Sequence, residues 1–218
     1  MKIRRTNLLS LGLVALSLVM GAALYARLPQ LSPAHFTSRP WEPFILPLVM
    51  LGVLLLFLAI PRISPRGYRV ERFQNAFEIT QVALLSLLLL VNLLIVLAGL
   101  GVPVPVRQAA RAGTGLLFVV LGNFMGKFTK NFFLGIRTPW TLASDEVWLR
   151  TNRLGGKLVV LTGLVLLASS FLGAGAIWFL LTIPVAVGIP IVYSYILYRR
   201  IEGFKDGTND QDTPRSSP

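Results

Sequence analysis

The sequence predicts an all-α, polytopic integral membrane protein with about six transmembrane helices and cytoplasmic N- and C-termini. Of its 218 residues, 54% are hydrophobic and only 14% are charged, whereas soluble domains contain about 25% charged residues. Charged residues are absent from 79–106 and from 158–198, and a helix needs about 20 apolar residues to cross a bilayer. Each of these tracts is therefore long enough to span a membrane at least once.

Six apolar segments are expected to form the spanning helices, at 8–26, 44–60, 79–100, 106–121, 158–171 and 177–198. The first is longer than the core of a signal peptide, and GAALYAR at its end offers no A-x-A cleavage pattern, which favours an uncleaved helix. The third contains Gln81 and Asn92, of which we interpret Asn92 as a hydrogen-bonding partner for a neighbouring helix. The fourth begins with Arg107 and Arg111, which we expect to extend to the outer interface; an anion site between helices is the alternative.

The chain divides into three regions. Residues 1–105 form an N-terminal membrane region of three helices, with a proline-rich outer loop at 27–43. Residues 106–200 form a core of three helices with a cytoplasmic loop at 122–157, and 201–218 form a cytoplasmic tail. The four prolines of the outer loop remove backbone donors and favour irregular chain, and the polar, Pro/Ser/Asp-rich composition of the tail predicts disorder.

The positions of the basic residues predict the topology. Of the 21 lysines and arginines, three lie in 1–7, four in 61–78, six in 123–157 and four after residue 198. If six helices alternate in direction, all 17 of these fall on one side, with only Arg27, Arg39, Arg107 and Arg111 on the other. Basic residues collect in cytoplasmic loops, so the stretch at 122–157 is placed inside and the proline-rich loop outside.

The stretch at 122–157 is the longest polar interruption between apolar runs, and the rest of the chain is organised around it. It contains six basic residues and only two acids. It also contains six aromatic side chains, namely Phe124, Phe128, Phe132, Phe133, Trp140 and Trp148. Ordinary connections between helices are shorter than this, so we expect the function to reside here.

The residue pattern of this stretch is not that of an enzyme or a metal site. In GNFMGKF three residues stand between the glycines, whereas a phosphate loop has four between them and a Ser or Thr after the lysine. Asp145 and Glu146 are adjacent and would point about 100° apart on a helix; we interpret them as the first-turn acids of a short helix capped by Ser144 and ended by Gly155–Gly156. The chain has no cysteine, and its single histidine, His35, cannot form a zinc site alone. We therefore expect no catalysis, no cofactor and no bound metal.

On that short helix, Trp148, Thr151 and Asn152 would share one face, and Arg150 and Arg153 another. Two interpretations of such a basic, aromatic surface stay open. It can anchor the protein to anionic lipid headgroups, or it can form a docking platform for a cytosolic partner, since Trp and Arg are enriched at binding hot spots.

The order and spacing of rare residues in this stretch resemble the SdpI family of multi-pass bacterial membrane proteins. The resemblance extends over about 115–166 and rests on GNFM, KN, GIRTPWTL, SDEVW and TNRLGGK, at 122–125, 130–131, 135–142, 144–148 and 151–157. The start of the chain through LPQLSPAHF, at 28–36, is similar to a short domain of unknown function that often precedes the family's core. After residue 36 the sequence TSRPW replaces that domain's usual glycine and acidic positions.

The resemblance implies a function in immunity and signalling at the bacterial cell membrane. The family's type member protects its cell against the secreted SdpC toxin and recruits a small winged-helix autorepressor to the membrane. It follows that the partners would be the lipid bilayer, an SdpC-like toxin outside and an autorepressor inside, with no direct binding of nucleic acid. The implied partner-binding or signalling residues are Asn123, Asn131, Gly135, Arg137, Thr138, Pro139, Trp140, Thr141, Glu146, Trp148, Asn152, Arg153, Gly156 and Lys157.

We further expect a ligand outside or within the membrane to shift the two helices at 106–121 and 158–171, because the stretch is tethered to both. The alternatives are a small-molecule or ion transporter or channel, and a structural membrane protein without a toxin partner. A transporter or channel would favour ionisable residues within the membrane, and the central parts of the expected helices contain none.

Overall fold

A computed structural model describes residues 5–31, 40–64, 73–172 and 177–203. Within these ranges the regular structure is entirely helical. The long helices are α1 (Arg5–Leu31), α3 (Ile45–Ile63), α4 (Gln74–Gly99), α5 (Val106–Met125), α7 (Asp145–Phe171) and α8 (Ile177–Ile201). Two short elements, the 3-10 helix η1 (Glu42–Phe44) and the helix α6 (Pro139–Ala143), complete the described fold.

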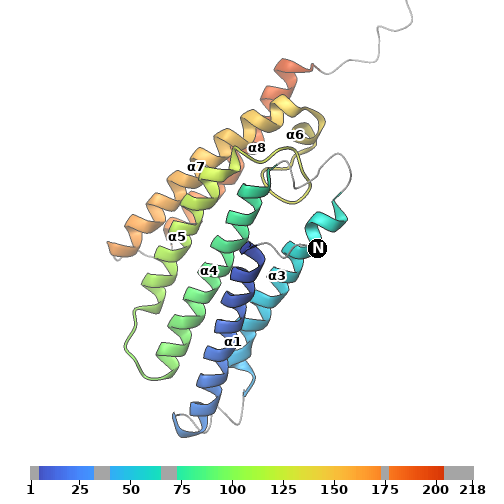
Figure 1. Ribbon diagram of the computed structural model, residues 1–218. Coiled ribbons are helices and arrows are strands. Elements are labelled where there is room, and N and C mark those ends of the chain that lie inside the picture. The colour runs from blue at the N-terminus through green and yellow to red at the C-terminus, as the bar shows by residue number, and fades with distance from the viewer. Residues whose placement is uncertain (1–4, 32–39, 65–72, 173–176, 204–218) are drawn as a thin grey trace, which may run out of the picture.

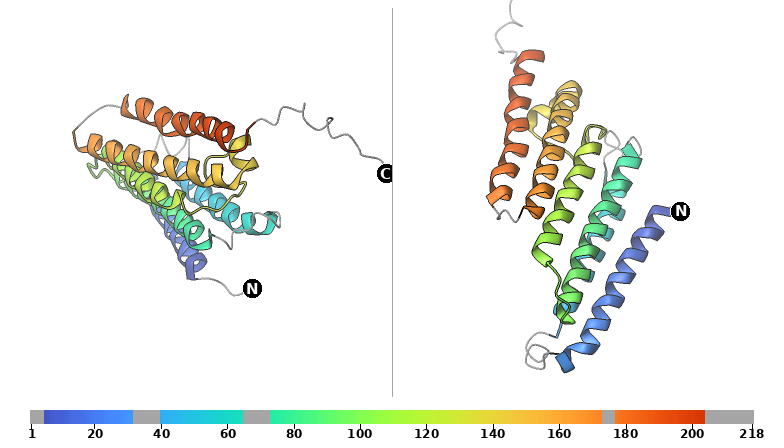
Figure 2. Two further views of the ribbon diagram at one scale, coloured as in Figure 1. Left: turned by 90° about the horizontal axis from the view of Figure 1, so that it is seen from above. Right: turned by 90° about the vertical axis from the view of Figure 1, so that its left-hand side faces the viewer.

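The long helices run alternately up and down, side by side (Figure 1). Five of them, α8, α7, α5, α4 and α1, follow one another in a row, and α3 packs on one side of the row against α1 and α4 (Figure 2). One end of the molecule therefore carries the start of α1, the end of α3, the start of α4, the end of α5, α6, the start of α7 and the end of α8. The predicted cytoplasmic segments that the structure describes thus lie together at this end, which we call the basic end.

Five described helices, α1, α3, α4, α7 and α8, are long and apolar enough to cross a membrane. The all-helical, multi-pass fold predicted from the sequence is confirmed. Helix α5 is not among the five, although it runs beside α4 and α7 (Figure 1). Arg107 and Arg111 lie in its first two turns and lower its hydropathy. The six-helix count and the cytoplasmic location of the basic end stay predictions.

Polar side chains join α1 to α4 within the apolar region. The Gln81 side chain donates to the Ser10 hydroxyl over 2.9 Å, and the Asn92 side chain donates to the Ser17 hydroxyl over 2.9 Å. All four residues are buried. Interhelical hydrogen bonds of this kind hold membrane helices together, so the interpretation of Asn92 as a packing residue is confirmed, and Gln81 does the same.

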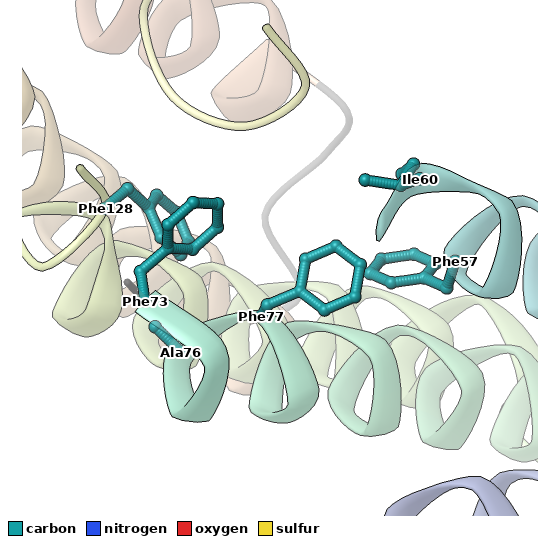
Figure 3. Close-up of a cluster of buried hydrophobic side chains, with 6 residues drawn as sticks. All are labelled: Phe57, Ile60, Phe73, Ala76, Phe77 and Phe128. Atoms are coloured by element: carbon teal, nitrogen blue, oxygen red, sulfur yellow. The ribbon is translucent and has the colours of Figure 1, made fainter. Parts of the chain in front are cut away.

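An aromatic cluster links α3 and α4 to the chain that follows α5 (Figure 3). The rings of Phe57 and Phe77 lie 5.0 Å apart between their centroids, and those of Phe73 and Phe128 lie 5.7 Å apart in an edge-to-face arrangement. Such pairs are favourable beyond the area they bury. Because Phe128 follows α5, this cluster attaches the basic end of the core to the N-terminal helices.

Glycines allow α5 and α7 to pack backbone against backbone. A Cβ atom at Gly122 would lie 2.6 Å from the carbonyl oxygen of Gly156, and one at Gly156 would lie 2.6 Å from that of Gly122. Gly115 and Gly163 form a second such pair, seven residues along each helix. Small residues at the contact let membrane helices approach closely, so α5 and α7 form one tightly packed unit.

Several predicted boundaries are wrong. Gly155–Gly156 does not end a helix, because both glycines are buried in packing against α5 and the loop, and α7 continues from Asp145 to Phe171. The predicted cytoplasmic loop at 122–157 is therefore shorter: α5 extends to Met125 and α7 supplies the second part of the stretch. The predicted outer loop at 27–43 also begins too early, since α1 extends to Leu31 with Pro29 in its last turn, where the missing N–H costs only one helical hydrogen bond. His35 lies outside the described residues.

Candidate docking surface

The candidate surface, which we call the platform, consists of the loop 126–144 and the first turns of α7. It lies at the basic end, next to the end of α8 (Figure 1). Apart from the short helix α6, this loop has no regular structure. Its backbone donors and acceptors therefore need partners other than those of a helix.

Asn131 organises the first part of the loop. Its side-chain oxygen accepts from the backbone N–H groups of Phe133 and Leu134 at 2.8 and 2.7 Å, and its side-chain nitrogen donates to the carbonyl oxygen of Thr129. Asparagine forms local turns of this type readily. The residue is fully buried, so its side chain supports the loop from within.

Two buried side chains of α7 fix the loop to the core. The indole Nε1–H of Trp148, only 2% exposed, donates to the carbonyl oxygen of Phe128 over 2.8 Å. The side-chain oxygen of Asn152 accepts from the backbone N–H of Ile136 over 2.8 Å. Gly135, with φ +98°, passes so close that a Cβ atom would lie 2.5 Å from the Asn152 side-chain oxygen. A glycine is required here both by the positive φ and by the lack of space.

The second part of the loop is joined to α8. Thr138 and Thr141 bond each other's backbone N–H groups as the capping box that begins α6. The Thr138 hydroxyl also lies 3.0 Å from the hydroxyl of Ser194 on α8. The Trp140 ring packs edge-to-face on Tyr195 with centroids 5.0 Å apart. These two contacts connect the platform to the last helix.

The outer face of the platform is basic. Lys127, Arg137, Arg150, Arg153 and Lys157 are exposed, and we call these five residues the basic rim. Arg150 pairs with Glu146, and Arg137 donates to the carbonyl oxygen of Phe132. Half-buried Lys130 pairs with Asp145 at 2.6 Å, which joins the loop to the start of α7.

The exposed face of α7 changes character along its length. It carries charge at Glu146, Arg150, Arg153 and Lys157, and then becomes apolar with Leu161, which is 57% exposed. A polar face belongs in water or among headgroups, and an exposed apolar one in lipid. We infer that the membrane interface crosses α7 between Lys157 and Leu161, so the basic rim projects beyond the hydrocarbon.

The structure divides the predicted site residues into two sets. The residues that are exposed and therefore available to a partner are Asn123, Arg137, Pro139, Glu146, Arg153 and Lys157. The buried ones are Asn131, Thr138, Thr141, Trp148, Asn152 and Gly156, while Gly135 and Trp140 are half-buried. The predicted faces of the first turns of α7 are confirmed, since Trp148, Thr151 and Asn152 are buried and Arg150 and Arg153 are exposed. Ser144 is the N-cap of α7 as predicted, but its side chain makes no capping hydrogen bond.

The sequence does not identify the residues of α8 that the platform contacts. Ser194 and Tyr195 lie far along the chain, and only the tertiary structure brings them to α6. The sequence does contain a signal for the glycine pairs between α5 and α7. Gly115 and Gly122, like Gly156 and Gly163, are seven residues apart and therefore share a helix face. The hydroxyls of Thr129 and Thr151 are buried without a partner among the described residues, and the sequence gives no reason for this.

The fold and this surface define a multi-pass helical membrane protein. Residues 127–195 match the SdpI/YfhL protein family, which confirms the resemblance and places it further toward the C-terminus than 115–166. Together with the apolar helices, this similarity indicates a multi-pass protein of the bacterial cytoplasmic membrane. The chain is also similar to "Immunity protein SdpI" of Bacillus subtilis (strain 168), with 29% identity over 209 residues that cover 91% of this chain and 99% of the relative. No solved structure matches the chain.

Proposed function

We propose that this protein is a membrane immunity protein against a secreted, SdpC-type toxin, and that it signals by recruiting a cytosolic autorepressor to the platform. The observation that carries the immunity function is the similarity to an immunity protein along 91% of the chain. The basic rim supports the second function, because it offers exposed charge on the loop 126–144 and on the first turns of α7, which buried hydrogen bonds from Trp148 and Asn152 join to each other.

The contacts of the loop suggest how the two functions are coupled. We expected the helices now seen as α5 and α7 to shift, but the reciprocal glycine contacts make independent movement of these two helices costly. Helix α8 packs on α7 less extensively than α5 does, and the loop contacts α8 through the hydroxyl pair Thr138–Ser194 and the ring pair Trp140–Tyr195. In our proposal a toxin moves α8 relative to the α5–α7 unit and thereby alters the platform.

The test separates protection from recruitment. The double variant Arg153→Gln, Lys157→Gln removes two exposed charges without touching the buried contacts of the loop. It is compared with wild type and with Arg107→Gln, which removes an exposed charge at the opposite end of α5. Each is produced at equal membrane abundance in a toxin-sensitive strain, and survival is measured together with membrane localisation of a fluorescent winged-helix repressor.

We expect the double variant to protect as well as wild type and to recruit the repressor about fivefold less, since two exposed ion pairs worth about 0.2–1 kcal/mol each would be lost. Arg107→Gln should recruit normally. Full recruitment by the double variant would contradict the docking function. A wild-type chain that gives no protection would contradict the immunity function and leave recruitment to be judged separately.

A further inference from the structure

Helix α4 has one face that the other described helices cover only in part, because α5 packs along its edge at Leu87 and Leu90. Its buried residues Phe77 and Leu85 face α3, and Gln81 and Asn92 face α1. The opposite face carries residues spaced by three, four or seven positions, which places them on a single side of the helix. These are Asn75, Ile79, Val82, Ala83, Ser86 and Leu90.

Three adjoining cavities follow this face, with volumes of about 550, 480 and 260 Å³. The first two share Asn75 and Ile79 as lining residues, and the second and third share Ala83. Together they form one groove along α4, bordered by α5 and by Thr6 of α1. From Asn75 to Leu90 the groove is about 22 Å long, given 1.5 Å per helical residue.

The two ends of the groove differ in chemistry. At the basic end the lining includes Asn75, Gln74 and the exposed Lys127, whose Nζ lies 4.6 Å from the centroid of the Phe124 ring. Further along α4 the lining is almost entirely apolar, with Leu87, Leu90, Leu116 and Val120. This polarity matches that of a phospholipid, with a headgroup at the interface and an acyl chain along the membrane normal.

Charge at the basic end favours an anionic headgroup. The first turn of α4 contains no acidic residue, and its N-cap, Phe73, has no capping oxygen, so its N–H groups add to the positive potential of Lys127. Glu78 lines the second cavity, where its carboxylate accepts from the hydroxyl of Thr6 and the side chain of Gln74, each over 2.6 Å. Among the described residues, the lining of the first cavity, which contains Lys127, includes no acidic side chain. The length of the groove also fits a phospholipid. One leaflet of hydrocarbon is about 15 Å thick, and the rest of the groove accommodates a headgroup.

We propose that this groove binds one anionic phospholipid of the leaflet at the basic end, with its phosphate at Lys127 and an acyl chain along α4. Bound in this way, the lipid would cover the face of α4 that lies opposite α3. It would also fill the space between α4 and α5, beside the aromatic cluster that supports the platform.

The full-length chain in phosphatidylcholine nanodiscs tests the proposal. A minor fraction of either phosphatidylglycerol or phosphatidylcholine carries a photoactivatable acyl chain, and lipid adducts are mapped by mass spectrometry. We expect phosphatidylglycerol to label peptides of α4 and α5 in preference to phosphatidylcholine. Lys127→Gln should reduce this labelling about fivefold, whereas Lys157→Gln, which removes an exposed lysine of α7 at the same end, should leave it unchanged.

A second pair of variants tests the groove itself. Ser86 is exposed at its middle, so Ser86→Trp should block the labelling, while Leu161→Trp on the exposed face of α7 should not. Equal labelling by both lipids, or equal loss in the two lysine variants, would overturn the proposal. Binding of inorganic phosphate that Lys127→Gln abolishes, with no labelling of the groove by either lipid, would identify a free anion as the ligand and would also overturn it. Disulfide-linked dimers of a Ser86→Cys variant, in a chain with no natural cysteine, would identify a second copy as the occupant and overturn it as well.

Discussion

At the scale of single residues, the platform owes its shape to buried side chains that bond the backbone of an irregular loop. Asn131, Trp148 and Asn152 bond the loop backbone, and Thr138 and Thr141 form the cap of its one short helix. A buried backbone group without a partner costs free energy. These residues therefore determine whether the exposed basic rim is presented at all, although a partner would not touch them.

Trp148→Phe should destabilise the protein more than Trp140→Phe. The first change keeps a buried ring but leaves the carbonyl oxygen of Phe128 without its donor, at a cost of about 1–3 kcal/mol. The second keeps a ring against Tyr195, so we expect a smaller loss. Thermal unfolding of the purified variants in detergent, followed by circular dichroism, measures both. Equal stability of the two variants would show that the indole hydrogen bond contributes little.

Gly135→Ala should loosen the loop 126–144. An alanine at φ +98° is strained, and its Cβ atom would lie 2.5 Å from the side-chain oxygen of Asn152. We expect the bond from Asn152 to the backbone of Ile136 to break and protease cleavage within the loop to become faster by at least about tenfold. Gly52→Ala is the control, since a Cβ atom at Gly52 meets nothing within 4 Å. A cleavage rate equal to that of the control would argue against this account.

At the scale of elements, hydrophobic runs predicted the existence of the long helices but not their ends. The predicted segment 158–171 is the apolar part of α7, which begins 13 residues earlier at Asp145. Its first turns are polar, and glycine usually ends helices, so sequence rules favoured a break at Gly155–Gly156. Tertiary packing overrides that preference because α5 and Ile136 occupy the space beside these glycines.

The sequence indicated which stretch forms the candidate site, but not which of its residues support the loop and which are exposed. The spacing of Trp148, Thr151 and Asn152 indicated a common face, and burial confirms it. Which residues support the loop and which are exposed depends on contacts such as Thr138 with Ser194, 56 residues apart, that no local pattern encodes. The predicted set therefore mixes exposed residues with residues that support the loop.

Gly122→Ala should separate α5 from α7. The added methyl group would lie 2.6 Å from the carbonyl oxygen of Gly156 and 2.7 Å from the backbone nitrogen of Val160, neither of which can move without shifting a helix. Overpacking of this kind typically costs about 1–3 kcal/mol. The measurement is the mole fraction of sodium dodecyl sulfate that unfolds half the protein, with Gly12→Ala in open space as the control. An unchanged midpoint for Gly122→Ala would mean that the two helices are not closely packed.

At the scale of the whole molecule, the alternating helices bring the described basic segments to one end although they are distant in sequence (Figure 1). This arrangement agrees with the prediction from basic residues, but it depends on α5 crossing the membrane. Helix α5 packs on α7 through Gly115 and Gly122, and Gly115 is paired with Gly163 well within the apolar part of α7. We therefore expect α5 to cross despite Arg107 and Arg111, whose long side chains can extend to the interface.

Single cysteines can decide this, because the chain has none of its own. Val102→Cys lies in the turn between α4 and α5, and Asn123→Cys and Arg153→Cys lie at the basic end, all at exposed positions. A membrane-impermeant maleimide added to intact cells should label only Val102→Cys, and permeabilised cells should add the other two. Labelling of Val102→Cys and Asn123→Cys from the same side would mean that α5 does not cross, and labelling of Arg153→Cys from outside would reverse the predicted orientation. If α5 does not cross, the helices that carry the platform lie differently in the membrane. If the orientation is reversed, the platform cannot reach a cytosolic repressor. The signalling proposal therefore requires the predicted topology.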